Sequence, residues 1–150
     1  MLSENESSPE RVLLVDDSPV ERLALGHFLR NAGYLVDEAG DGESAILHVK
    51  HREVDLMLLD LQMPGGGGFA VLKYLQEHRR ALPVVLLSGM PLYQIQHKMH
   101  GLPTQELPPL LIKPVDPEQL LGVLELQLTG ALSNRTDVGP SDAGDTPPPQ

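Results

Sequence analysis

Cysteine is absent from all 150 residues of the sequence. Its absence excludes disulfide bonds and metal sites with thiolate ligands, and it fits a reducing compartment such as the cytosol. Basic residues are scarce, with 11 lysines and arginines against 21 aspartates and glutamates and a formal net charge of -10. Because binding to phosphate backbones or anionic lipids needs clustered basic side chains, this balance argues against a direct nucleic-acid or membrane surface.

Long apolar runs are absent as well. No run approaches the roughly 18 residues that a membrane helix needs. The polar, acidic beginning MLSENESSPE lacks the basic start and the apolar stretch of a signal peptide. We therefore expect a soluble, cytoplasmic protein.

The composition changes near both ends of the chain. Residues 1–10 are polar, and residues 130–150 are rich in proline, glycine, aspartate and serine, which bury little apolar area. We expect a flexible leader over 1–10, one domain over 11–129 and a disordered tail or linker over 130–150.

Short apolar runs alternate with longer stretches of helical period inside this domain. Strands are expected over 11–15, 34–39, 55–59, 83–88 and 109–112, and helices over 19–33, 41–53, 69–80 and 116–128. Ser18 and Asp116 stand where helix N-caps are expected, and Gly33 where a helix stops. The alternation is typical of βαβ units and predicts an α/β fold with a parallel sheet covered on both faces. The segment 90–107 has a weak pattern with two prolines, so at most a short helix is expected there.

Polar residues stand at the ends of four expected strands. Asp16 and Asp17 follow the first, Asp60 the third, Ser88 the fourth and Lys113 the fifth. Ligands of open parallel sheets bind at the carboxyl ends of the strands, so these residues are expected to share one edge. The acids could instead be only helix caps and turn residues, which three acids beside a lysine make less favourable.

Three neighbouring carboxylates repel one another unless a cation compensates them, and ligands that are all oxygen favour Mg²⁺ over Zn²⁺. A carboxylate can attack phosphorus to give an acyl phosphate when the growing charge is neutralised. Asp60 is the candidate nucleophile, with Lys113, the metal ion and the Ser88 hydroxyl as stabilising groups. The glycines of MPGGGG after Asp60 indicate a tight turn, since they lack the pattern of a phosphate-binding loop.

The motifs LLVDDSP, LLDLQMPGGGG, LLSG and IKP, in this order, resemble the receiver domain of bacterial two-component response regulators over residues 11–129. The resemblance implies a flavodoxin-like, doubly wound five-stranded parallel sheet of order 2-1-3-4-5. It also implies Mg²⁺ ligation by Asp17, Asp60 and the Gln62 carbonyl, with Asp16 in the outer environment of the ion. Asp60 would accept a phosphoryl group that Ser88 and Lys113 contact, and the Lys113–Pro114 bond would be cis.

The partners that the resemblance implies are a sensor histidine kinase or histidine phosphotransfer protein as donor, and a downstream effector protein or domain as target. A phosphorylation-dependent homodimer is a further implied possibility. The domain would be a stoichiometric phosphoacceptor that catalyses its own phosphorylation and dephosphorylation, not a turnover enzyme.

Two departures of the sequence from the family bear on the expected switch. Leu110 stands three residues before Lys113, where an aromatic switch residue is frequent, and the segment between Ser88 and Lys113 holds four prolines, Pro91, Pro103, Pro108 and Pro109. These departures leave open a degenerate receiver that acts as a phosphorylation-independent interaction module.

A phosphatase-like enzyme would use Asp60 as a transient nucleophile, but related hydrolases want a second acid where Gln62 stands. Turnover of a phosphomonoester is therefore less favoured than stoichiometric phosphorylation.

Two histidine pairs have a spacing of three residues, His48 with His51 and His97 with His100. This spacing could place both members of a pair on one helical face as metal ligands. Solvated helix surface is the favoured interpretation.

Overall fold

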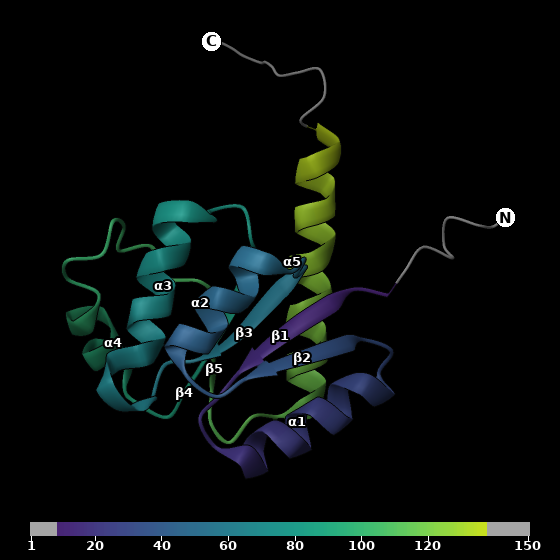
Figure 1. The fold of residues 1–150 in the computed structure, drawn as a ribbon, viewed down its shortest axis with the longest axis horizontal. Helices are drawn as coiled ribbons and strands as arrows, with labels where there is room; N and C mark the ends of the chain where they lie inside the picture. Colours follow the sequence, from purple (N-terminus) through teal and green to yellow (C-terminus); the bar gives the residue numbers. More distant parts are fainter. Residues whose placement is uncertain (1–8, 138–150) are drawn as a thin grey trace, which may run out of the picture.

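The computed structural model describes residues 9–137 and shows strands that alternate with helices (Figure 1). Residues 1–8 of the expected leader and 138–150 of the expected tail lie outside the described residues. The strands are β1 (Arg11–Val15), β2 (Leu35–Ala39), β3 (Leu56–Asp60), β4 (Val84–Ser88) and β5 (Leu110–Ile112). The helices are α1 (Pro19–Asn31), α2 (Gly42–His51), α3 (Gly67–His78), α4 (Leu92–Lys98) and α5 (Pro117–Asp137), with a short 3₁₀ turn, η2 (Pro64–Gly66), before α3.

The strands form one parallel sheet in the order β2-β1-β3-β4-β5. The order reverses after β1, because β2 lies on one side of it and β3 on the other. This arrangement confirms the parallel α/β sheet that the sequence pattern predicts, and the doubly wound topology and strand order that the resemblance implies. The carboxyl ends of β1 and β3 are adjacent at the reversal, which is where ligands of such sheets bind.

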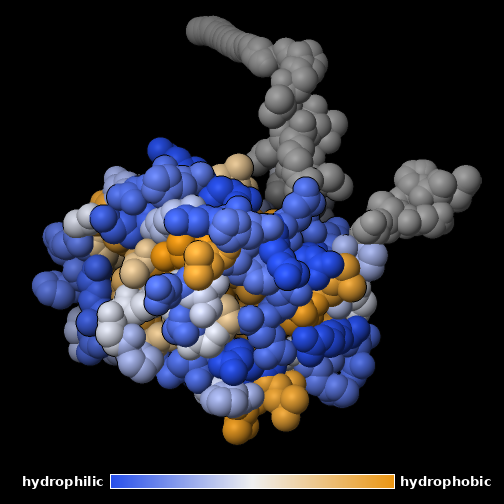
Figure 2. Space-filling model, in the orientation of Figure 1, coloured by the Kyte–Doolittle hydropathy of each residue, from blue (hydrophilic) through white to orange (hydrophobic). Residues whose placement is uncertain are grey.

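The helices cover both faces of the sheet (Figure 1). Helices α2, α3 and α4 pack on one face around Leu13, Met57 and Leu59, while α1 and α5 pack on the other around Leu14 and Leu58. Every residue of β3 and β4 is buried. Strands buried on both faces are expected to be continuously apolar, which explains the runs LMLL and VVLL. The face shown in Figure 2 is mostly hydrophilic, with small, scattered hydrophobic groups.

Residues at its two ends determine where α1 begins and where it stops. The Ser18 hydroxyl accepts a hydrogen bond from the Glu21 amide at 3.2 Å, as an N-cap does, and Pro19 occupies the first turn. Gly33 has φ of 103°, which favours glycine, and its amide donates to the Arg30 carbonyl just after the helix ends. Both residues act as the sequence predicts.

The segment between β4 and β5 contains little regular structure, as expected. Helix α4 has seven residues, and β5 has three. The helix is anchored by Ile95, which is fully buried, and the chain after it is anchored by Met99. Tyr93 on the same helix is 70% exposed.

Helix α5 continues to Asp137, beyond the expected domain boundary at residue 129. The boundaries of the domain and its flanking segments remain predictions. Within residues 9–137, none of the helices has the length and apolar character to cross a membrane.

Candidate functional site

Four polar residues from four strand ends come together at one edge of the sheet. Asp16 directly follows β1, Asp60 and Ser88 are the last residues of β3 and β4, and Lys113 directly follows β5. Asp16, Asp60 and Ser88 are buried, with at most 1% of their surfaces exposed. Burying acids is costly unless they are compensated, so this edge is a candidate site for chemistry and not simply part of the core.

Asp60 is held by one contact to each carboxylate oxygen. Its Oδ1 accepts a hydrogen bond from the Gln62 amide at 2.8 Å, and its Oδ2 lies 3.2 Å from the Lys113 ammonium nitrogen. The chain then turns sharply through Gly65 and Gly66, which have φ values of 70° and 72°. These glycines provide the tight turn that the sequence predicts.

Gly68 allows the turn to pack against the strand end. A Cβ atom on Gly68 would lie 2.6 Å from the Asp60 carbonyl oxygen and 2.7 Å from the Leu61 Cα. These are backbone atoms that cannot move aside easily. The start of α3 therefore approaches Asp60 so closely that only glycine fits at this position.

Asp16 is the most constrained acid of the site. Its Oδ1 accepts from the Ser18 amide at 2.9 Å, while its buried Oδ2 has no hydrogen-bond partner in the described part of the chain and lies 3.7 Å from the Lys113 nitrogen. Burial, and next the contact with Glu21, raises the pKa of Asp16 to about 6. The unpartnered oxygen is the feature that best fits a bound cation.

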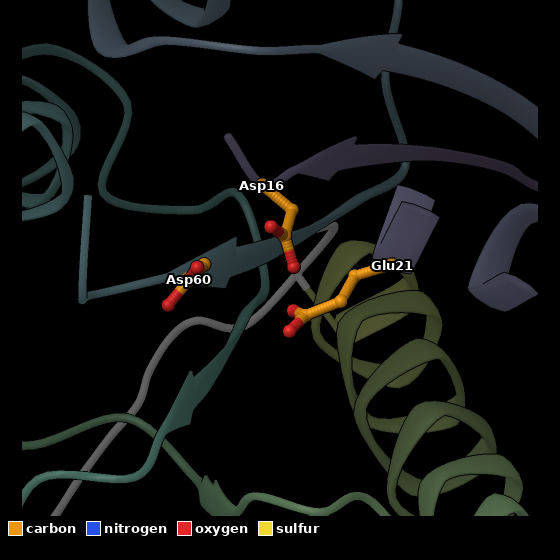
Figure 3. A group of neighbouring side chains, drawn as sticks. All are labelled: Asp16, Glu21 and Asp60. Atoms are coloured by element: carbon orange, nitrogen blue, oxygen red, sulfur yellow. The ribbon is translucent and has the colours of Figure 1, made fainter. Parts of the chain in front are cut away.

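Glu21, on the first turn of α1, is the third carboxylate of the site, and Figure 3 shows it reaching toward Asp16 and Asp60. Oxygens from these three acids lie within 4.8 Å of one another. Glu21 also pairs with Lys113, with 2.7 Å between Oε1 and Nζ. The pKa of Glu21 is lowered, first by its contact with Asp16 and then by Lys113.

Lys113 and Ser88 close the site on the side of β5. The Lys113 amide donates to the Ser88 carbonyl at 3.0 Å, and the Ser88 hydroxyl accepts from the Met90 amide at 2.8 Å. Burial alone would lower the pKa of Lys113, but the ion pairs with Glu21 and Asp60 raise it, so the side chain is a cation. The Lys113–Pro114 bond is cis, as the resemblance implied.

The structure gives less support to the two other expected metal ligands, Asp17 and the Gln62 carbonyl. Asp17 is exposed and does not belong to the group of three close carboxylates found among the described residues. The Gln62 side chain accepts from the Gly89 amide, and so joins the loop after β3 to the loop after β4. Their roles as metal ligands stay predictions. Glu21 was missed because nothing local in the sequence shows that a residue on α1 contacts Lys113, 92 positions away.

The donor set of the site fits a hard divalent cation such as Mg²⁺. Asp16, Asp60 and Glu21 offer oxygens only, and one buried oxygen of Asp16 lacks a partner within residues 9–137. Carboxylate oxygens with remaining positions for water are the environment that Mg²⁺ prefers. The chemistry of the residues present therefore agrees with the ion that the sequence predicts.

The histidine pairs are not brought into this site. His48 Nε2 lies 2.8 Å from Asp37 Oδ2, and His97 stacks edge to face on His100 with 5.8 Å between ring centroids. Neither pair belongs to the acidic group, which is the one candidate metal cluster among residues 9–137. His51, His97 and His100 are exposed, as the helix-surface interpretation expects, whereas the His48 side chain is only 17% exposed and pairs with Asp37.

Comparison with known proteins decides the family. The sequence matches the family described as response regulator receiver domain over residues 12–125. The chain belongs to this family. Receiver domains are modules of two-component systems, and the motifs LLVDDSP, LLDLQMPGGGG, LLSG and IKP all contribute to the polar edge around Asp60 in this receiver.

Several curated proteins resemble this receiver domain. Protein PilH of Pseudomonas aeruginosa is 33% identical over 80% of the chain and 98% of its own length. The probable transcriptional regulatory protein TcrX of Mycobacterium tuberculosis is 34% identical over 93% of the chain. The gliding motility regulatory protein of Myxococcus xanthus is 42% identical over 53% of the chain. The chain spans 56% of the TcrX length and 11% of the Myxococcus protein.

Solved structures share the fold of this receiver domain. The chemotaxis protein CheY4 of Vibrio cholerae matches with a TM-score of 0.69 and 29% identity, over 80% of this chain and 99% of that chain. A CheY-like receiver domain protein of Methanospirillum hungatei matches with a TM-score of 0.76 and 20% identity, over 85% and 99%. The second likeness concerns the fold alone.

Proposed function

We propose that this receiver domain accepts a phosphoryl group on Asp60 from a phosphohistidine, in a Mg²⁺-dependent phosphorelay that switches a protein-interaction surface. One observation carries the proposal: Asp60 is buried at the end of β3 with its Oδ2 3.2 Å from the Lys113 ammonium. A buried carboxylate beside a fixed cation, at the ligand-binding edge of the sheet, suits attack on an anionic phosphoryl group.

The transfer needs few groups. A carboxylate oxygen of Asp60 forms a bond to phosphorus while the bond from phosphorus to the donor imidazole nitrogen breaks, and that nitrogen keeps the electron pair. Lys113 neutralises charge on the phosphoryl oxygens, and the Ser88 hydroxyl donates a hydrogen bond to one of them. The domain acts as a stoichiometric phosphoacceptor that promotes its own phosphorylation and dephosphorylation.

The proposed metal ligands are Asp16, Asp17, Asp60 and the Gln62 carbonyl. When bound there, Mg²⁺ supplies positive charge that stabilises the phosphoryl oxygens. The unpartnered Asp16 oxygen and the all-oxygen donor set support this assignment. Asp17 would turn inward from its exposed position to take part.

The proposed donor is a sensor histidine kinase or a histidine phosphotransfer protein, and the proposed target is an effector protein or domain. Receiver domains of this family interact with kinases and effectors, and the long Myxococcus relative supports the idea that this domain also works within larger proteins. We further propose that the protein works in the cytoplasm of a bacterial cell and that phosphorylation promotes a homodimer.

The degenerate interaction module finds no support in the site. The acids, the lysine and the serine that the chemistry needs are present and adjacent. Leu110 is partly buried against the core that lies under α2, α3 and α4. A switch without an aromatic residue at this position would depend on movement of the loop after β4 toward the phosphoryl group.

The direct test is modification of the whole chain. The protein is incubated with acetyl phosphate, with Mg²⁺ or with chelator, and its intact mass is measured beside the Asp60→Asn variant. We expect one added phosphoryl group in the presence of Mg²⁺ and none in the variant. Absence of the adduct under every condition, together with no response to beryllofluoride, would reject the proposal.

A further inference from the structure

Lys113 lies between three carboxylates, and the shortest of its three contacts is not the one to Asp60. The Nζ atom is 2.7 Å from Glu21 Oε1, 3.2 Å from Asp60 Oδ2 and 3.7 Å from Asp16 Oδ2. An ammonium group has three donor hydrogens and can serve several acceptors. The closest of these acceptors is Glu21, so the ammonium lies nearer to this helix residue than to either aspartate.

The three acids differ in their freedom to move. The side chains of Asp16 and Asp60 are 0% and 2% exposed, whereas that of Glu21 is 47% exposed. Glu21 stands in the first turn of α1 on a longer side chain, so it can rotate into water and keep its charge solvated. The two aspartates cannot leave without uncovering the strand ends. Glu21 is therefore the movable partner of Lys113.

The negative charge of Glu21 also opposes the binding of a phosphoryl group, which is itself negatively charged. A phosphoryl group carries about -1.5 to -2 charges near neutral pH and needs a cation beside it. Glu21 occupies the nearest cation, and its own carboxylate lies within 4.8 Å of an Asp60 oxygen. Like charges at this distance repel, so Glu21 and a phosphoryl group compete for Lys113.

We propose that Glu21 is a positioning residue that holds the Lys113 ammonium in the unmodified domain and releases it when a phosphoryl group occupies Asp60. The ion pair weakens phosphoryl binding at rest and makes the return of Lys113 to Glu21 part of the reset after dephosphorylation. This inference rests on the proposed function of Asp60 as the phosphoryl acceptor.

The test compares the wild-type chain with Glu21→Gln, which keeps the size of the side chain and removes its charge. We expect beryllofluoride, titrated in saturating Mg²⁺ and followed by amide NMR, to bind the variant about two- to fivefold more tightly, the range of a half-exposed ion pair. Phosphorylation by acetyl phosphate should accelerate by a similar factor. Both differences should shrink as salt is added.

A matched control distinguishes the effect of removing the Glu21 carboxylate from the effect of changing the net charge of the protein. Glu53→Gln makes the same change of charge at an exposed residue just before β3, at the opposite end of that strand from Asp60. It should leave the titration and the rate unchanged. Glu21→Asp keeps the charge but withdraws the carboxylate by one methylene, and it should behave like Glu21→Gln because the contact to Lys113 is lost.

The position of Lys113 is read independently from the NMR signals of its ε-methylene group in protein without Mg²⁺. These signals should move in both Glu21 variants and stay in Glu53→Gln. A change in thermal stability without a change in these signals or in the titrations would indicate a purely structural role and overturn the inference. A loss of about tenfold or more in Mg²⁺ affinity in Glu21→Gln would also overturn it, because Glu21 would then act as a metal ligand.

The two proposals fail in different ways. If the wild-type chain accepts phosphate but the Glu21 variants match it, only the role of Glu21 is rejected. If neither the wild type nor Glu21→Gln responds to acetyl phosphate or beryllofluoride, the proposed function is rejected, and the inference with it. If Glu21→Gln accepts phosphate and the wild-type chain does not, the result would support the inference that Glu21 holds Lys113 away from the phosphoryl group.

Discussion

The polar pocket around Asp60 and the segment of residues 90–109 are neighbours in the fold but are built differently. Asp16 directly follows β1 and Asp60 ends β3, and these are central strands whose residues are almost all buried. The segment holds one seven-residue helix and irregular chain, anchored mainly by Ile95 and Met99. Groups fixed by a close-packed sheet keep their positions, whereas a sparsely anchored segment can move at low cost. From this comparison we infer that the pocket performs the chemistry and that the segment changes its conformation in response.

The largest expected effect is the loss of phosphoryl acceptance, which a substitution in the pocket should cause and a substitution in the segment should not. Asp60→Asn should abolish acceptance of a phosphoryl group, because an amide cannot form the acyl phosphate. Tyr93→Ala, at an exposed position of α4, should leave acceptance at the wild-type level. Intact mass after treatment with acetyl phosphate measures both. A modified Asp60→Asn protein would show that the acceptor lies elsewhere.

The second prediction applies one substitution to both regions. Lys113→Ala should slow phosphorylation by about 10²- to 10³-fold, the usual loss when a fixed group that stabilises transition-state charge is removed. Lys98→Ala, on the exposed last turn of α4, should leave the rate unchanged. Rates come from the same mass assay over time. Equal rates for the two variants would contradict the role given to Lys113.

The third prediction compares the loss of stability when alanine replaces each of two glycines. Gly68→Ala should destabilise the fold by about 2 to 3 kcal/mol, because its Cβ would overlap the backbone of Asp60 and Leu61. Gly101→Ala, with φ of 90° but open space around it, should cost about 1 kcal/mol through backbone strain alone. Urea unfolding measures both.

A control for these glycines is Gly122 of α5, where nothing lies within 4 Å of an added Cβ. Gly122→Ala should stabilise the protein by about 0.5 to 1 kcal/mol, as expected for alanine in a helix. If Gly68→Ala proved as mild as Gly101→Ala, the close packing of α3 against the end of β3 would be refuted.

The last prediction concerns the dependence of stability on Asp16 and pH. Its folded-state pKa of about 6 lies above the ordinary 3.8, so ionising it above pH 6 opposes folding, and this cost disappears as the pH falls below about 4. Without Mg²⁺, Asp16→Asn should therefore be more stable than wild type by about 1 to 3 kcal/mol at pH 7 and equally stable at pH 4. Chelator-treated samples followed by thermal unfolding test this. A difference that is independent of pH would rule out the ionisation of Asp16 as its cause.

The central strands and helix α1 were predictable because local and global signals agree there. The short apolar runs before Asp16 and Asp60 are typical of central strands of a parallel sheet, and Ser18 and Gly33 mark the ends of α1. Once the strands are placed, their carboxyl ends bring the acids and Lys113 together.

Other features depend on tertiary contacts that no local pattern records. Glu21 occupies an ordinary position in the first turn of a helix, and its contact with Lys113 joins residues 92 positions apart. The outward position of Asp17 depends on the backbone between β1 and α1. Helix α5 passes the expected end of the domain because its residues up to Asp137 include no proline after the first turn, although the chain just beyond them is rich in it.

The most direct test of the account is an amide NMR comparison of the Mg²⁺-bound domain with and without beryllofluoride. We predict shifts at Asp16, Asp60, Ser88 and Lys113 that spread through residues 90–109, depend on Mg²⁺ and are lost in Asp60→Asn. Shifts confined to the pocket would contradict the conformational response of the segment. No shifts at all would contradict the assignment of Asp60 as the phosphoryl acceptor.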